Sequence, residues 1–203
     1  MKGRAIGAFV ICLLLAGCSF KPLKPVVYDQ PTTVTTGKTA SIRRTAGVIG
    51  GSSPTGVVAV ESGVYVPIET GEVEAGYFGQ TDQDIFVESL GSELVRHGIF
   101  RSVLTGPAEK SATDVRISIV FISTYHNPDL QEYTLDVGVR MQSSHAMSAG
   151  RYYIRSSEGD SLWAKMNTSG NEGKSKAADK LMKALIPAIE RFLAKSPAEP
   201  ALP

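Results

Sequence analysis

The chain has 203 residues, with 21 lysines and arginines against 20 aspartates and glutamates, and its formal net charge is +1. This balance argues against a nucleic-acid-binding protein, which needs a concentrated basic face. A chain of this length can bury enough apolar surface to fold as one domain.

The first 17 residues have the pattern of a secretion signal. Lys2 and Arg4 give the segment a positive start, and residues 5–16 are predominantly apolar. A helix that crosses the bilayer core needs roughly 20 apolar residues, so this segment is too short to span a membrane. Its end differs from an ordinary cleavage site, because small residues run directly into a cysteine.

The residues at that end resemble the lipobox of bacterial lipoproteins; they are Leu15, Ala16, Gly17 and Cys18. The resemblance implies cleavage between Gly17 and Cys18, acylation of the Cys18 thiol with chains such as palmitate, and acylation of the new amino terminus. It also implies an outer-membrane destination, because Ser19 stands where an aspartate favours inner-membrane retention in enterobacteria. The alternative interpretation is a buried cysteine in a core helix.

Lipidation would leave the mature chain without a thiol, since Cys12 departs with the signal and Cys18 carries the lipid. A disulfide, a metal–thiolate site and a cysteine nucleophile are then excluded. No cofactor is expected beyond the acyl chains. One acyl chain binds a membrane reversibly, so several are needed for lasting attachment.

Residues 18–36 predict a lipidated, flexible tether. Pro22, Pro25 and Pro31 interrupt regular structure, and the threonines that follow offer little apolar surface. Proline-rich segments tend to be extended, at about 3.1 Å per residue. We therefore expect the tether to lift the folded body away from the membrane.

Residues 37–195 predict one domain, whose first part, residues 37–78, is glycine-rich and β-like. Residues 39–43 favour a strand. Residues 57–60 and 64–68 flank a short turn sequence, which predicts a hairpin.

A helix is expected to begin at Thr81 or Asp82 and to end before Gly98. Its apolar residues recur at helical spacing and are Ile85, Phe86, Leu90 and Leu94. The acidic residues expected to point elsewhere are Asp84, Glu88 and Glu93. Gly98 suits the left-handed position that commonly follows a helix.

Long strands follow, over residues 114–125 and 133–141, where apolar and polar residues alternate. Residues 151–155 and 161–166 predict a further hairpin. These strands belong to the helix–strands–helix part of the domain, residues 79–195.

The last helix is predicted over residues 174–194, with a kink or a break at Pro187. Residues 196–203 are rich in proline and alanine and predict a disordered tail. The order of elements indicates an α+β fold, in which an antiparallel sheet carries two helices on one face as a two-layer sandwich.

No catalytic residue is predicted, and no metal site. The histidines are His97, His126 and His145, and none has a second ligand at metal-binding spacing. No acid pair, nucleophile–base arrangement or cofactor motif is present, so we expect a protein without enzymatic activity.

Three aromatic residues are candidates for a ligand cleft between the sheet and the helices. They are Trp163, Tyr152 and Tyr153, all placed on predicted strands. For Trp163, the alternative is an ordinary packing role within the sheet.

The helix exit Leu90, Leu94, Gly98-Ile99-Phe100 and Val103, followed by long strands and a C-terminal amphipathic helix, resembles small outer-membrane lipoproteins of the YajG type. It also resembles auxiliary lipoproteins of envelope transport systems. The similarity covers residues 80–195 and implies no catalytic residues.

The sequence thus favours a periplasm-facing, lipid-anchored protein of the outer membrane that serves as an accessory or scaffold in a cell-envelope complex. Its expected partners are membrane lipid, through the acyl anchor, and an envelope protein. The alternative hypothesis is a module that binds lipid, glycan or peptidoglycan fragments.

Overall fold

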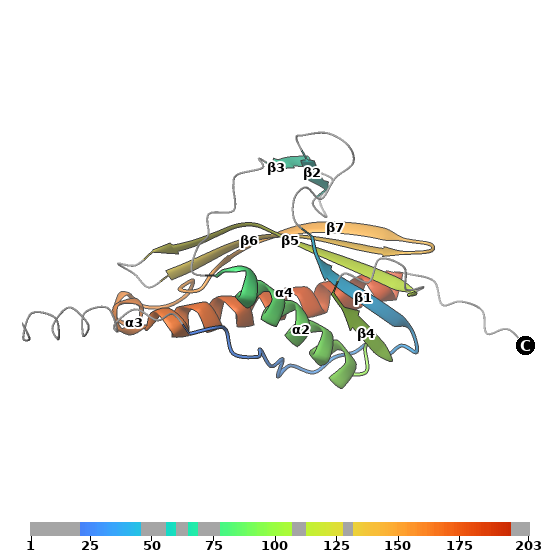
Figure 1. Ribbon diagram of the computed structural model, residues 1–203, viewed down its shortest axis with the longest axis horizontal. Helices are drawn as coiled ribbons and strands as arrows, with labels where there is room; N and C mark the ends of the chain where they lie inside the picture. Colours follow the sequence, from blue (N-terminus) through green and yellow to red (C-terminus); the bar gives the residue numbers. More distant parts are fainter. Residues whose placement is uncertain are drawn as a thin grey trace, which may run out of the picture.

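A five-stranded β-sheet carries two long helices on one of its faces (Figure 1). The computed structural model describes residues 21–45, 56–59, 65–68, 78–106, 113–127 and 132–195. The elements in chain order are β1 (Thr39–Arg44), β2 (Gly56–Ala59), β3 (Tyr65–Ile68), α2 (Gln80–Arg96), β4 (Ser102–Thr105), β5 (Val115–Asn127), β6 (Glu132–Ser143), β7 (Met147–Arg155), α3 (Leu162–Asn167) and α4 (Gly170–Lys195). The predicted signal, residues 1–17, and the predicted tail, residues 196–203, lie outside the described residues.

The strands lie in the order β4-β1-β5-β6-β7. β5, β6 and β7 are antiparallel neighbours, whereas β1 runs parallel to both β4 and β5. Parallel neighbours need a crossover connection, and the chain between β1 and β4 contains α2. The predicted α+β class is therefore confirmed, but the sheet is mixed and not antiparallel throughout.

Alternating apolar residues build the helix-facing side of the sheet, and those on the first half of β5 are Val115, Ile117 and Ile119. A β-bulge between Phe121 and Ser123 then inserts one residue into β5. The insertion exchanges the two faces of the strand. As a result Thr124 pairs with Leu135 and is buried, whereas Tyr125 is 56% exposed.

α2 buries the predicted apolar stripe, with Phe86, Leu90 and Leu94 fully inaccessible. α2 begins at Gln80, so the predicted start at Thr81 or Asp82 is one to two residues late. The end agrees with the prediction, because Gly98 has φ +69°. That left-handed conformation strains residues with a side chain but not glycine.

α3 replaces the strand that was predicted over residues 161–166. The hydroxyl of Ser161 accepts a hydrogen bond from the Ala164 amide at 3.2 Å, which caps the first turn. The predicted hairpin is wrong for this reason. β7 pairs with β6 instead, as one long antiparallel pair.

α4 is one continuous helix that contains Pro187, so the predicted break is not observed. Proline removes one backbone donor from a helix interior and crowds the preceding turn. The residues around it are deeply buried; they are Leu185, Ile186, Ala188 and Ile189. Packing against the sheet offsets the cost of the proline.

Residues 21–36, here called the N-terminal strap, belong to the folded body. Leu23, Val26 and Tyr28 are buried in the same core as the helices and the sheet. The strap has no regular secondary structure, and in Figure 1 it runs in blue beside α2 and α4. The prediction of a flexible tether is wrong for residues 21–36.

The predicted hairpin near residues 57–68 is confirmed, since β2 and β3 pair antiparallel with Gly56 opposite Ile68. Its connecting turn lies outside the described residues. No helix in the described part of the chain combines the length and the apolar character needed to cross a membrane.

Candidate functional site

The N-terminal end of the strap is fixed by a buried ion pair between the two helices. Lys174 Nζ of α4 lies 2.9 Å from Asp82 Oδ2 of α2, and both side chains are less than a tenth exposed. Asp82 Oδ1 accepts the amide of Leu23 at 2.6 Å, and Lys174 Nζ donates to the carbonyl of Lys21 at 3.0 Å. The ion pair thus accepts a hydrogen bond from one backbone amide of the strap and donates one to a backbone carbonyl of the strap.

The middle of the strap is held by the same face of α2. Ser89 Oγ accepts the amide of Val26 at 3.1 Å, and Glu93 Oε2 accepts the amide of Tyr28 at 2.9 Å. Positions seven and four apart on a helix share a face, so Asp82, Ser89 and Glu93 form one polar row. The three side chains of this row accept hydrogen bonds from successive backbone amides of the strap, those of Leu23, Val26 and Tyr28.

Glu93 is also paired with Arg96, whose guanidinium donates to the carbonyl of Tyr28. Burial alone raises the pKa of Glu93, but the hydrogen bonds from Arg96 and from the Tyr28 amide outweigh it. The pKa of Glu93 therefore lies below its ordinary value. The prediction that Glu93 points away from the body is wrong, whereas Asp84 and Glu88 are not buried.

The C-terminal end of the strap is fixed by α4. Glu190 Oε1 accepts the amides of Thr33 and Val34 at 2.6 and 3.0 Å. Thr36 Oγ1 then donates to the carbonyl of Ile99 at 2.6 Å, just before the chain enters β1. Buried backbone donors must find acceptors, and three carboxylates supply most of them here.

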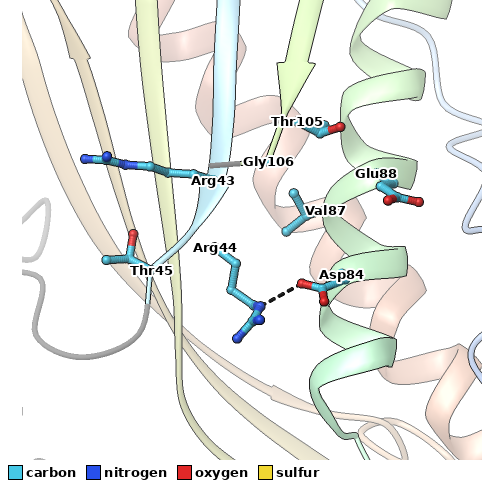
Figure 2. A pocket seen from close by; sticks show the side chains of 8 residues that line it. All are labelled: Arg43, Arg44, Thr45, Asp84, Val87, Glu88, Thr105 and Gly106. Carbon is cyan, nitrogen blue, oxygen red and sulfur yellow. Dashed lines mark hydrogen bonds and ion pairs between the residues drawn. The ribbon is translucent and has the colours of Figure 1, made fainter. Parts of the chain in front are cut away.

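An open cleft of about 600 Å³ lies where β1 ends beside β4 and α2 (Figure 2). Arg44 Nε lies 2.8 Å from Asp84 Oδ1, so an ion pair bridges β1 and α2. Arg43 extends from the other side of β1, and Glu88 follows Asp84 one turn later on α2. Within the described residues, the hydroxyl of Thr45 is buried without a hydrogen-bond partner.

The described residues that line this cleft carry charges of both signs, and none of them is a histidine or a cysteine. Its residues can form hydrogen bonds and ion pairs with a polar ligand. The cleft is therefore a candidate site for the recognition of a polar ligand.

The histidines occupy three separate places. His97 Nε2 lies 3.0 Å from the Tyr28 carbonyl at the strap, the His126 ring lies 4.5 Å from that of Tyr133, and His145 lies in the turn before β7. In the part of the chain that the structure describes, no three potential ligands are close enough to hold a metal ion.

The three aromatic residues predicted to line one cleft lie apart. Tyr152 pairs with Val137 on the helix-facing side of the sheet, whereas Tyr153 pairs with Asp136 on the opposite side and is 65% exposed. Trp163 lies on α3 and is 76% exposed. The structure therefore does not bring them into a common cleft, because adjacent strand residues face opposite ways.

Gly17 and Cys18 lie outside the described residues, so lipidation stays a prediction. The residues that hold the strap were not singled out by sequence. The available signal was the row Asp82, Ser89 and Glu93 on the same helix as the apolar stripe. A polar row beside an apolar one is common on half-exposed helices, so it does not by itself indicate a docked segment.

Comparison with known proteins finds no family model that matches the chain. It also finds no curated protein that matches. Among solved structures, the chain is similar to the DUF330 protein XCC0632 of Xanthomonas campestris, at 13% identity and a TM-score of 0.48, over 86% of this chain and 97% of that one.

Two further solved structures have a comparable likeness. A PelC variant dodecamer from Paraburkholderia phytofirmans is 10% identical with a TM-score of 0.44, over 80% of this chain and 95% of that one. The hypothetical protein CT253 of Chlamydia trachomatis is 8% identical with a TM-score of 0.44, over 79% of this chain and 100% of that one. These likenesses concern the course of the chain alone.

Proposed function

We propose that the protein is a lipid-anchored, periplasm-facing lipoprotein of the outer membrane, acting as a non-enzymatic accessory or scaffold subunit of a cell-envelope complex. Leu15, Ala16, Gly17 and Cys18 supply the lipidation signal. The observation that carries the proposal is the position of the strap. Its first described residue, Lys21, comes three positions after Cys18 and is already bonded to α4.

A lipid on Cys18 would therefore attach to a rigid body and not to a long arm. Covalent geometry limits three residues to a reach of about 11 Å. A scaffold subunit held this close to the bilayer presents a fixed surface to its partners, which suits assembly at one height above the membrane. The engagement of Asp82, Glu93 and Glu190 with the strap is a structural use of buried carboxylates, which supports a non-catalytic role.

The lipidation part of the proposal is tested in cells with radiolabelled palmitate and membrane fractionation. The wild-type chain should incorporate label and sediment with the outer membrane. Cys18→Ala should lose both, whereas the matched variant Cys12→Ala should keep both, because Cys12 lies inside the predicted signal. Label that persists in Cys18→Ala, or wild-type protein without label, would contradict the proposal.

The partner is sought by crosslinking in cells and mass spectrometry, comparing wild type with Cys18→Ala. A complex subunit should give defined protein crosslinks that disappear when the anchor is removed. Recovery of cell-wall or lipid material alone would favour the ligand-binding alternative.

That alternative is supported by a smaller hollow of about 260 Å³ between β7 and the C-terminal end of α4. Tyr152, Arg191 and Lys195 line it, so a ring and two cationic side chains face one space. This alternative is tested by titrating the protein with anionic glycan or lipid fragments and measuring the NMR chemical shifts of the β7 amides. Binding that Arg191→Gln abolishes would support it, and unchanged shifts would reject it.

A further inference from the structure

We propose that the end of the molecule formed by α3 and the start of the strap is its membrane-contacting surface, with Trp163 placed in the lipid headgroup region. The inference rests on the proposed lipidation of Cys18 and deepens it, because it assigns the face that the anchor turns toward the bilayer. The partner is a phospholipid surface.

The start of the strap is located by its bonds to the first turns of α4. Lys174 Nζ donates to the Lys21 carbonyl at 3.0 Å. Lys174 is itself fixed by Asp82 and is almost fully inaccessible. An acyl chain on Cys18 would therefore enter the bilayer within about 11 Å of this point.

α3 lies beside the first turns of α4, and the chain on each side of α3 is hydrogen-bonded to α4 or to its first residues. On one side, Asp160 accepts from Lys176 of α4 at 3.4 Å, and Lys180 donates to the carbonyl of Glu158 at 2.7 Å. On the other side, the chain returns through Ser169, whose carbonyl accepts the Gly173 amide at 2.9 Å. Figure 1 shows α3 beside the first turns of α4.

Trp163 is exposed on this excursion. Its fractional exposure of 76% is the largest among the exposed large apolar residues of the described chain. An indole ring has a large apolar body and one polar N–H, which makes the membrane interface its preferred environment. A lone exposed tryptophan needs no explanation by itself, but here it lies at the end where the anchor would enter.

The lysines at this end complement a phospholipid surface. Lys21 and Lys24 are exposed at the start of the strap, close to where the anchor would enter the bilayer. Long cationic side chains can extend toward lipid phosphates while their stems cover apolar surface. The bilayer is the occupant that these positions favour, because an acyl anchor on Cys18 would hold this end of the molecule against it.

The chain has one tryptophan, so its fluorescence reports on this surface alone. Lipidated wild-type protein is reconstituted into vesicles of phosphatidylethanolamine and phosphatidylglycerol, with or without bromine on the upper acyl carbons. We expect a blue shift of the emission on reconstitution and a loss of intensity in the brominated vesicles. Cys18→Ala mixed with the same vesicles should show a much weaker response.

A second measurement follows hydrogen exchange of the α3 amides in the lipidated protein, with and without vesicles. Protection should increase in wild type and less so in Trp163→Ala. The matched variant Tyr153→Ala removes an exposed ring from the other side of the sheet and should behave as wild type. Both residues are exposed, so neither variant should impair folding.

The outcomes separate this inference from the proposed function. Palmitate on Cys18 together with unquenched emission and unchanged α3 exchange would overturn the membrane surface while lipidation stands. A blue shift that depends on protein concentration and resists bromine would show that a second copy of the chain covers Trp163, which also overturns it. Absence of palmitate would refute the proposed function and this inference with it.

Discussion

The carboxylate of Glu190 accepts the backbone amide of Thr33 at 2.6 Å, although 157 positions separate the two residues. Through this bond the C-terminal helix holds the segment that leads into the first strand. Asp82 and Glu93 hold the earlier part of the same segment from α2. The two ends of the described chain are thus joined through one extended, proline-containing strap.

Because the strap packs in the core, truncating its buried side chains should lower the free energy of unfolding, which would not be expected of a free tether. Leu23→Ala should lower the free energy of unfolding by about 2–5 kcal/mol, because Leu23 is buried among the helices. The matched variant Val27→Ala, at a position 61% exposed, should change it by no more than about 0.5 kcal/mol. Denaturant unfolding of the mature chain measures both, and equal, negligible effects would mean that the strap does not pack.

The acceptor role of Glu190 predicts that its substitution lowers the unfolding free energy more than substitution of an exposed glutamate on the same helix. Glu190→Gln keeps the shape of the side chain but removes the charge that strengthens three hydrogen bonds, from the amides of Thr33 and Val34 and from the Thr33 hydroxyl. We therefore expect a loss of about 1–2 kcal/mol in unfolding free energy. Glu172→Gln, also on α4, removes only a surface pair with Lys176 and should lose about 0–0.5 kcal/mol. A larger loss in Glu172→Gln than in Glu190→Gln would contradict the assigned role.

Sequence patterns anticipated the elements whose evidence is local. The apolar spacing of α2, the left-handed Gly98 and the alternation in β6 each follow from residues within one element. The parallel placement of β1 depends on its neighbours in space, and β4 has only four residues, too few for a periodic pattern.

The strap was missed for a related physical reason. Its prolines and threonines have no helical or strand periodicity, and its buried apolar residues, Leu23, Val26 and Tyr28, are too few to indicate burial by themselves. Their burial depends on acceptors that α2 and α4 supply from distant positions. The same limit applies to the predicted aromatic cleft, because the switch from strand to helix at Ser161 placed Trp163 on a different element.

The lowered pKa of Glu93 predicts a pH dependence of stability. Burial raises this pKa, but hydrogen bonds from Arg96 and from the Tyr28 amide lower it by more than burial raises it. The folded state therefore favours the ionised carboxylate. The resulting stabilisation is fully present above the ordinary glutamate pKa of 4.5 and is lost as the pH falls through the folded pKa. Glu93→Gln should therefore lose less stability than wild type on acidification through this range.

Denaturant midpoints of the two proteins, measured from neutral pH to well below 4.5, give the comparison. The wild-type curve should fall more steeply with acid, and the two curves should converge at low pH. Asp114, whose pKa is lowered mainly by the hydrogen bond from the Thr39 amide, contributes equally to both proteins and cancels. Parallel curves would show that Glu93 is not stabilised in its ionised form.

The buried ion pair between Lys174 and Asp82 predicts that a substitution of Asp82 restores part of the stability lost in Lys174→Met. Lys174→Met should cost about 3–5 kcal/mol in unfolding free energy, because it leaves the Asp82 carboxylate buried without its cation. In the double variant with Asp82→Asn, the side-chain oxygen at position 82 can still accept the Leu23 amide, and no charge stays buried. The double variant should therefore be more stable than Lys174→Met alone, and a double-mutant cycle measures the coupling. Additive losses would mean that the two side chains do not act as a pair. Lys174→Met also removes the donor to the Lys21 carbonyl, so limited proteolysis should cut the start of the strap faster in both variants than in wild type.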